Sequence, residues 1–430
     1  MVMNRNMIKF AIMSWVFMSM FCSCTPDNLD YHDNSKMEIG SIDSVALTAN
    51  HVMVLADGNA RLEFVPKLFT KDRNQISASR VDYDCLEFVS ESGELFSRYF
   101  STNDLSRVGE IVNVKMRVKN TDLESNFISF KIAEPLENVY QSDIVIPVVF
   151  HIVQTEDDIE SFGGAYKQEQ INLILNKLNN MFTGVLTNNP VGVNTHIQLK
   201  AAIYDQYGKK MPEPGINRLI VEDISTDNQY EDFLSSQHLI WNPDQYMNIW
   251  LISDRESKVG DFANNVSELC VPAYVLPETG DVLDGLICNK YQDEILLARE
   301  AGIIFKLQEL DNMNRGFFND DDKPVNNELG YYVGRYLGLL ATCNYASAAG
   351  TDYCFDTHDY FPDINAIGEN KTWYKEASGC YFRAENIMDD PRGVHSSVSK
   401  EQCKRMRWVL EHCVGRLAWK SNFAFVGQNN

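Results

Sequence analysis

Residues 41–135 alternate between hydrophobic and polar positions, which is typical of strands that are buried on one face. The clearest run places hydrophobic and polar residues in turn: Val112, Asn113, Val114, Lys115, Met116, Arg117 and Val118. Residues 128–132 alternate in the same way, and turn signals lie at Gly58 and Gly93. Several short strands separated by turns predict a β-sandwich over this part of the chain.

The predicted sandwich is of the immunoglobulin-like kind, because about a hundred residues with this strand spacing are typical of it. Residues 41–135 contain no Trp, and Cys85 is their only cysteine, so the disulfide and tryptophan of antibody domains are excluded. Cys85 is expected to be a buried thiol. Nothing in this region indicates catalysis, so a role as a spacer or docking domain is predicted.

The hydrophobic pattern changes in the second part of the chain. Near-continuous or alternating apolar runs predict strands, and apolar residues at helical spacing predict helices. The expected strands are residues 144–153, 197–203 and 247–252, and the expected helices are residues 168–182, 296–310 and 400–419. Strands and helices together indicate an α+β fold, with a sandwich followed by a mixed domain.

Two local features refine this prediction. Ser399 and Gln402 have the spacing of a capping box, so the last helix is expected to begin between them. His151 lies on the first buried strand, where a single histidine is usually satisfied by hydrogen bonds and does not bind a metal.

Residues 326–342 have the small and apolar residues of a zinc-protease helix but lack the histidines that bind the zinc ion. Such a helix needs two histidines four positions apart and a glutamate beside the first, and in metzincins a glycine then turns the chain toward a third histidine. The stretch has Gly334 and Gly338 at suitable positions. No histidine lies between His238 and His358.

This stretch resembles the active-site motif of pappalysin-like metzincins, and within them of bacterial zinc-dependent metalloproteinase lipoproteins. Their pattern runs roughly T-L-x-H-E-x-G-H-Y-L-G-L-x-H-T-F. The resemblance places Tyr331 at the first histidine and Tyr332 at the glutamate. It places Arg335 at the second histidine and Ala341 at the third. The motif is therefore degenerate, and the resemblance implies a metzincin-like domain over residues 144–420 without zinc ligands.

A second register keeps one possible catalytic remnant. It sets Asn327 and Glu328 at the histidine and glutamate, and Tyr331 at the second histidine. This register retains a glutamate but supplies no nitrogen ligand, and it breaks the match to the Tyr-Leu-Gly-Leu segment. The first register is therefore preferred.

Two later segments extend the resemblance. Residues 385–389 resemble the Met-turn, with Met388 as the hydrophobic base beneath the metal, and Asp390 stands where relatives have a tyrosine. Asp352, Asp356 and Thr357 match a segment that holds calcium in some relatives. Calcium needs several oxygen ligands in one place, so these residues permit calcium, and a solvated acidic loop is the alternative.

The first residues indicate export. Residues 1–24 have a short basic start and an apolar run too short to span a bilayer, which predicts a lipoprotein signal peptide with Cys24 lipidated. Residues 25–40 would form a polar tether, and an ordinary secretory signal is the alternative. The expected location is the bacterial cell envelope, anchored in a membrane through lipid, on the outer membrane or cell surface.

Charge and cysteine content add two expectations. The 430-residue chain has a formal net charge of −22, which opposes binding to nucleic acid. In an oxidising compartment some cysteines should pair. At least one disulfide is predicted among Cys270, Cys288, Cys343, Cys354 and Cys380.

Three functions follow from these patterns. The first is a pseudoprotease that binds a protein, peptide or glycan in the remnant cleft, holds no zinc and does not cut. Its large replacement side chains would either fill the metal cavity or form a contact surface. The second is an active hydrolase with a non-standard site, using Glu328 or the pair Asp352 and Asp356. The third is a structural surface lipoprotein that interacts through its sandwich.

Overall fold

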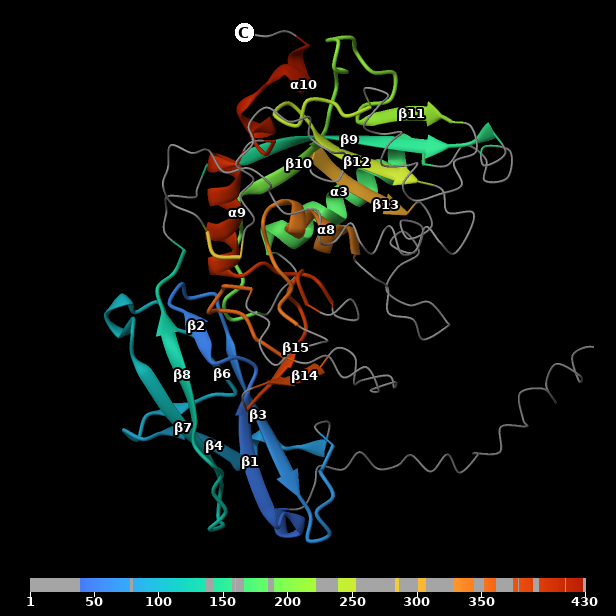
Figure 1. The fold of residues 1–430 in the computed structure, drawn as a ribbon. Coiled ribbons are helices and arrows are strands. Elements are labelled where there is room, and N and C mark those ends of the chain that lie inside the picture. Colours follow the sequence, from blue (N-terminus) through green and yellow to red (C-terminus); the bar gives the residue numbers. More distant parts are fainter. Residues whose placement is uncertain are drawn as a thin grey trace, which may run out of the picture.

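The fold is a mixture of strands and helices in which strands predominate (Figure 1). The computed structural model describes residues 39–77, 80–136, 142–156, 159, 166–184, 189–221, 239–252, 283–285, 301–306, 328–343, 352–360, 374–377, 379–389, 394–413 and 415–427. The predicted signal peptide with Cys24, most of the predicted tether, and Cys270, Cys288 and Asn327 lie outside these residues. The α+β class is as predicted.

Two sheets form the N-terminal region. One sheet contains β1 (Ser44–Ala49), β3 (Leu62–Phe69) and β6 (Tyr99–Phe100). The other has the order β2 (Met53–Leu55), β8 (Ile128–Ala133), β7 (Ile111–Val118), β4 (Leu86–Ser90) and β5 (Leu95–Phe96). Every second side chain of β3 and β7 is buried, so the predicted alternation is confirmed there.

Aromatic side chains join the two sheets. The fully buried Phe64 of β3 stacks on Phe88 of β4, with 5.1 Å between ring centroids. Its ring also lies 6.0 Å from that of Phe96 and 6.1 Å from that of Phe130. The sheets therefore share one core, but this arrangement alone does not establish an immunoglobulin-like topology.

A hairpin from far along the chain completes the first sheet. β14 (Tyr374–Ala377) and β15 (Cys380–Arg383) are antiparallel partners, and β15 lies beside β1 with Ala49 opposite Cys380. Lys67 of β3 also forms an ion pair with Glu376 of the hairpin at 3.1 Å. The N-terminal sheet therefore combines strands that are about 300 residues apart in the sequence, and the local alternation could not indicate this pairing.

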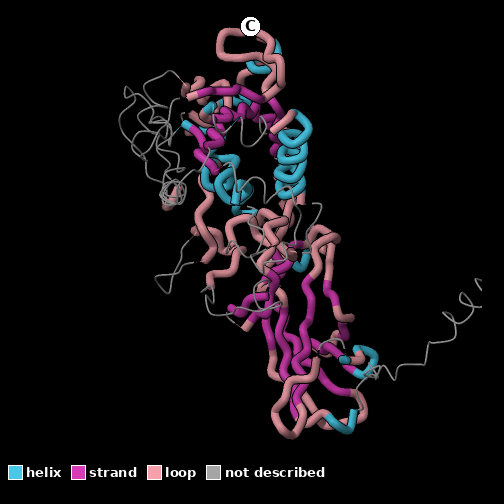
Figure 2. Tube along the Cα trace, turned by 90° about the vertical axis from the view of Figure 1, so that its right-hand side faces the viewer, coloured by secondary structure: helices cyan, strands magenta, loops and turns pink. Residues whose placement is uncertain are grey.

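A parallel sheet forms the centre of the second region. Its order is β10 (Ile197–Ala201), β9 (Ile144–Gln154), β12 (Met247–Ile252) and β13 (Gly302–Lys306), and β11 (Ile216–Ile220) pairs with the end of β9. The longer helices among the described residues lie in this half of the molecule, whereas the other half is rich in strands (Figure 2). The strands predicted near residues 144, 197 and 247 are confirmed.

Two helices pack together beside this sheet. They are α3 (Gln168–Thr183) and α8 (Glu328–Tyr336), and they contact β10 and β13 respectively. A Cβ on Gly330 of α8 would meet Sδ of Met181 in α3 at 2.7 Å, so the missing side chain permits the close approach.

His151 is a satisfied core residue, as predicted. Its Nε2 lies 2.9 Å from Oδ1 of Asn248, and its Nδ1 lies 2.9 Å from Nδ2 of Asn217. Its ring stacks on Trp250 and is fully buried. Burial lowers the pKa of His151 to about 4, so the ring is neutral at ordinary pH.

The helix predicted for residues 296–310 is wrong where the structure describes that segment. Residues 302–306 form β13, which pairs in parallel with β12. Ile303, Ile304 and Phe305 are all buried, and a short apolar run of this kind suits a buried strand as well as a helix. The strand is the better fit because Gly302 lies against Asn248, where any Cβ would clash with the backbone oxygen.

The last predicted helix is confirmed at its start and is shorter at its end. Ser399 and Gln402 form the expected capping box of α9 (Lys400–His412). The helix ends at Cys413, and the chain continues through the 3-10 helix η7 (Ala418–Lys420) and α10 (Phe423–Val426).

The cysteines differ from the prediction. None of the six described cysteines forms a disulfide, so Cys343, Cys354 and Cys380 do not pair with one another. The prediction rested on export and on their placement near loops, and all three are buried in the structure. Cys85 is a half-buried thiol whose Sγ lies 2.8 Å from the carbonyl oxygen of Asp82. Within the described residues, no helix has the length and hydropathy needed to cross a membrane.

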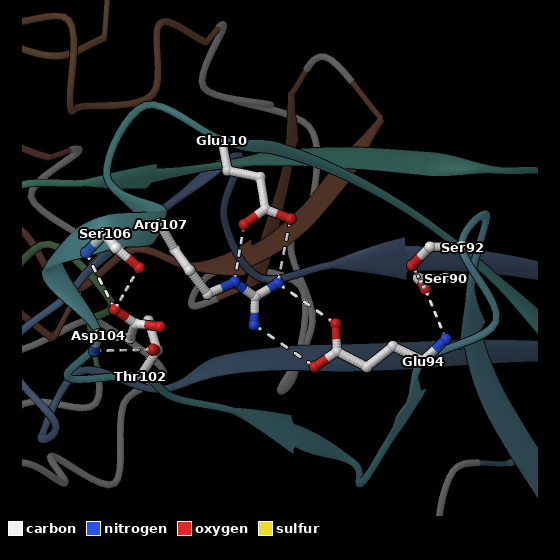
Figure 3. Close-up of polar contacts among 8 residues, drawn as sticks. All are labelled: Ser90, Ser92, Glu94, Thr102, Asp104, Ser106, Arg107 and Glu110. Atoms are coloured by element: carbon white, nitrogen blue, oxygen red, sulfur yellow. Dashed lines mark hydrogen bonds and ion pairs between the residues drawn. The ribbon is translucent and has the colours of Figure 1, made fainter.

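Ion pairs cover part of the N-terminal surface. Arg107, in the 3-10 helix η4 (Leu105–Arg107), donates from Nε to Glu110 at 2.7 Å and from Nη2 to Glu94 at 3.3 Å (Figure 3). Asp104 accepts hydrogen bonds from the backbone nitrogen of Ser106 at 2.9 Å and from its hydroxyl at 2.6 Å. These contacts fix a surface turn.

Candidate functional site

The end of α8 turns sharply at Gly338. Gly338 has a φ of +87°, its backbone nitrogen donates to the carbonyl of Arg335 at 2.9 Å, and Leu339 donates to the carbonyl of Gly334 at 2.9 Å. These two bonds form a Schellman motif, in which a left-handed residue satisfies the last helix carbonyls and redirects the chain. The structure therefore places a glycine turn directly after α8.

The loop that carries Met388 lies against α8. A Cβ on Gly334 would meet Sδ of the fully buried Met388 at 2.6 Å, so helix and methionine are in close contact. Thr342 donates from its backbone nitrogen at 3.0 Å and from its hydroxyl at 3.1 Å to the carbonyl of Met388. The same hydroxyl lies 2.5 Å from Oδ1 of Asp389. Hydrogen bonds of Thr342 therefore connect the segment after Gly338 to the loop that carries Met388.

The residues that the preferred register aligns with the protease motif do not share one environment. Tyr331 and Arg335 are four residues apart on α8 and are both half-buried, so they lie on one face of the helix. Tyr332 is buried, and its ring lies 5.7 Å from Phe305 of β13. Ala341 is half-buried beyond the turn, and Glu328 is the first residue of α8. Tyr332 thus contributes to the packing of helix on sheet.

The donor groups at these positions do not fit a zinc ion. Zinc in proteins is held by cysteine thiolates, histidine nitrogens or carboxylates. The guanidinium of Arg335 is charged and has no acceptor atom, and Ala341 has no donor at all. Across the described ranges, no group of three or more His, Cys, Asp or Glu side chains has the geometry to hold a metal ion.

Two buried arginines bind the carbonyl end of α8. Arg405 of α9 donates from Nε to the carbonyl of Gly338 at 2.6 Å, and Arg416 donates from Nε to the carbonyl of Tyr336 at 2.7 Å. The guanidinium of Arg416 also lies 3.7 Å from the ring centroid of Tyr336. Positive charge at a helix C-terminus is favourable, so these residues stabilise the turn. The sequence gives no spacing signal for either contact.

The predicted calcium residues are hydrogen-bonded to protein groups. Asp352 accepts from the backbone nitrogen of Cys354 at 3.0 Å and from the hydroxyl of Thr357 at 2.7 Å. Asp356 accepts from the hydroxyl of Ser399 at 2.6 Å and from the backbone nitrogen of Glu401 at 2.9 Å. Burial raises the pKa of Asp352 to about 6 and that of Asp356 to about 7. The hydrogen bonds of Asp356 therefore connect its loop to the start of α9. Calcium binding by these residues stays a prediction.

A small polar cavity lies where this loop meets the N-terminal region. The cavity has a volume of about 140 Å³, and its lining includes His51, His358, Phe382 and Glu385. The ring of His358 lies 4.2 Å from that of His51 and 4.0 Å from that of Phe382, and its Nε2 lies 3.2 Å from the carbonyl of Asn50. Stacked rings therefore join the two regions of the chain.

Comparison with known proteins gives a likeness of structure only. No protein-family profile matches the chain, and no curated protein matches its sequence. The structure is similar to Tannerella forsythia mature mirolysin in complex with a cleaved peptide, with a TM-score of 0.43 and 20% identity over 67% of this chain and 99% of the other. Mirolysin in complex with compound 9 gives a TM-score of 0.40 and 19% identity over 67% of this chain and 99% of the other. Mirolysin is a metallopeptidase of the metzincin type. At these TM-scores the likeness assigns neither a family nor an activity.

Proposed function

We propose that this chain is a lipid-anchored envelope protein whose second region is a pseudoprotease. In this proposal the region has a metzincin-like frame, and the remnant cleft binds a protein, peptide or glycan without cutting it. One observation carries the proposal. Gly338 turns the chain after α8, and the loop that carries Met388 packs on this helix, which supports a frame of this kind. Tyr331 and Arg335 share one half-buried face of α8, where the preferred register would put two ligands.

The chemistry supports binding more than cleavage. A zinc protease needs a metal to polarise the peptide carbonyl and a base to activate water. In the preferred register the base position is Tyr332, which is buried against Phe305. A tyrosine and an arginine on a half-buried helix face are residue types that often dominate protein interfaces.

The frame can be tested by restoring a metal site. The triple variant Tyr331→His, Arg335→His and Ala341→His should bind zinc, because three histidines would then supply nitrogen ligands. Tyr332 is kept, since a glutamate there would place a charge among buried aromatic rings. Isothermal calorimetry on the folded triple variant and on the parent measures the effect.

The matched control is the same variant with Arg335→Gln in place of Arg335→His. It should bind zinc at least about tenfold more weakly, because one nitrogen ligand is missing. Equal zinc affinity in the parent, control and triple variant would show that the register or the frame is wrong. One equivalent of zinc retained by the parent after mild chelation would refute the pseudoprotease itself.

The remaining assignments are part of the same proposal. Residues 1–24 are the signal peptide with Cys24 lipidated, residues 25–40 the tether, residues 41–135 an immunoglobulin-like sandwich, and residues 144–420 the metzincin-like domain.

Cys24→Ala should release the protein from the membrane fraction and abolish acylation. Addition of calcium should raise the melting temperature if Asp352, Asp356 and Thr357 hold it, and Asp352→Asn should remove that shift.

Point variants suit these tests better than removal of residues 41–135. β15 pairs with β1, and Lys400 of α9 donates to the carbonyl of Glu134 and to its carboxylate, each at 3.0 Å. A deletion would therefore expose a strand edge and a buried lysine of the second region.

A further inference from the structure

A groove of about 400 Å³ is lined mainly by residues of α9 and of the segment around Tyr353, and neither Tyr331 nor Arg335 lines it. Five of its side chains are central to its chemistry: Tyr353, Phe355, Lys404, Arg405 and Trp408. Glu401 and Glu411 lie at the two ends of this stretch of α9. Pockets of this size that combine apolar walls with a few polar groups are typical binding sites.

The aromatic wall of the groove is held rigidly although it is exposed. The side chain of Phe355 is 87% exposed, whereas its backbone nitrogen donates to the carboxylate of Glu401. The neighbouring Asp356 is bonded to Ser399 and to the backbone of Glu401. A large aromatic residue that is presented to solvent by a fixed backbone is a frequent anchor of protein interfaces.

The backbone beside Phe355 is strained. Tyr353 is 45% exposed and has a φ of +57°, in the left-handed region that tyrosine rarely adopts. Its ring lies so close to Gly285 that any Cβ at that position would clash with it. Strain of this kind persists where the surroundings fix the residue, and it is frequent at binding sites.

The groove also contains an unsatisfied positive group. Arg405 is only 6% exposed, and its Nε donates to Gly338. Its Nη2 has no hydrogen-bond partner within the described part of the chain. The guanidinium lies 5.9 Å from the ring centroid of Tyr353, so it is next to the aromatic wall. A buried donor without an acceptor is unfavourable, and a ligand that supplies an acceptor would relieve this.

Two carboxylates near the groove are hydrogen-bonded to other groups, and Asp284 also lies close enough to act on the charge of Arg405. Asp352 uses both oxygens for Cys354 and Thr357, and Glu401 binds the backbone of Phe355. Arg405 forms no ion pair with a carboxylate among the residues that the structure describes. The guanidinium keeps an unbonded Nη2 for an incoming anion. Lys404 also lines the groove, and its Nζ lies 3.9 Å from the carboxylate of Glu134.

We propose that this groove binds the C-terminal residue of a peptide or protein. The terminal carboxylate would lie against Arg405 and Lys404, and an aromatic or large aliphatic last side chain would lie between Phe355 and Trp408. The planar guanidinium matches a carboxylate with two parallel hydrogen bonds. This ligand combines a negative charge for Arg405 and Lys404 with an apolar side chain for the aromatic wall. The inference does not depend on the pseudoprotease proposal, since none of these residues belongs to the degenerate motif.

The test compares two probes that differ in one group. Acetyl-Gly-Gly-Phe with a free carboxylate should bind the full-length protein, and the same peptide with a C-terminal amide should bind at least about tenfold more weakly. Titration followed by isothermal calorimetry gives both affinities. Equal affinities, or no binding of the free acid at millimolar concentration, would overturn the proposal.

Variants assign the binding to the groove. Phe355→Ser should weaken binding of the free acid about tenfold, because the apolar wall is lost. Phe127→Ser is the matched control, since Phe127 is another exposed phenylalanine, 50% exposed, in the N-terminal region. Lys404→Gln should reduce the preference for the acid over the amide. Arg405→Lys should reduce it further, and circular dichroism shows whether that variant folds. Unchanged binding in Phe355→Ser would place the peptide elsewhere and refute the proposal.

Discussion

The N-terminal sheets and the segment from α8 to α9 are stabilised by different means. In the sheets, alternate side chains enter a shared aromatic core around Phe64. In the α8–α9 segment, buried polar groups bind backbone atoms that are distant in sequence. Arg405 and Arg416 bind the end of α8, and Asp356 binds the start of α9.

The difference shows which features a sequence can reveal. Burial of every second residue is a local property, so it can be read from a short run of letters. A buried arginine that binds a carbonyl is a long-range property, since its partner depends on how the whole chain packs. Apolar residues from both regions nevertheless belong to one continuous core, so the two modes stabilise one structure.

The largest expected effect is in the aromatic core. Phe64→Ala should lower the free energy of unfolding by about 3–5 kcal/mol, because it removes a fully buried ring and leaves a cavity. Denaturant unfolding measures the change, and Phe127→Ala is the exposed control. Hydrogen exchange of α9 should also rise in Phe64→Ala, since β15 and Lys400 connect the regions. Unchanged exchange in α9 would show that the regions unfold separately.

The second prediction concerns His151, a polar group inside the parallel sheet. Its pKa is lowered to about 4 in the folded protein, against 6.5 for the ordinary group. Between these pH values the unfolded chain binds the proton and the folded chain does not, so stability falls as the pH falls. The loss from this one group should be on the order of 3 kcal/mol between pH 6.5 and 4.

His151→Phe isolates that contribution. The variant is less stable at pH 7, because Asn248 and Asn217 lose their partner, but its stability should depend less on pH. Urea unfolding at several pH values gives the difference between variant and parent. His196→Asn serves as the control, because His196 is only half-buried. Parallel pH profiles for parent and His151→Phe would contradict the prediction.

Much of the fold could be predicted, and the site only in part. The α9 capping box and the strands β7, β9 and β12 follow from local spacing, and the structure has them. Met388 is in contact with α8, and its assignment to a Met-turn stays a prediction. The sequence pattern predicts a helix where β13 lies, because a short buried run has the same composition in both structures. The pairing of β15 with β1 and the binding of Arg405 and Arg416 to α8 depend on tertiary packing.

The third prediction tests the glycine turn. Gly338→Ala should destabilise the protein by about 1–2 kcal/mol, because alanine is disfavoured at a φ of +87°. Gly40→Ala is the matched control, since a Cβ at residue 40 would have no atom within 4 Å and the residue has no positive φ. Thermal unfolding of both variants measures the difference. Equal melting temperatures would show that the turn at residue 338 relaxes without strain, and would weaken the assigned Schellman motif.

The smallest expected effect is at the surface of the N-terminal region. Arg107 forms ion pairs with Glu94 and Glu110, and all three side chains are partly exposed (Figure 3). Exposed ion pairs contribute little, because water and salt screen the charges and the long side chains lose freedom. Glu110→Gln should therefore change the free energy of unfolding by less than about 1 kcal/mol, and the change should shrink further in about 1 M salt. Denaturant unfolding at low and high salt measures both quantities. Glu110→Gln could instead lower the free energy of unfolding as much as Gly338→Ala does, at low and high salt alike. Polar contacts would then stabilise the sheets as strongly as they stabilise the α8–α9 segment, and the contrast between the two regions would no longer hold.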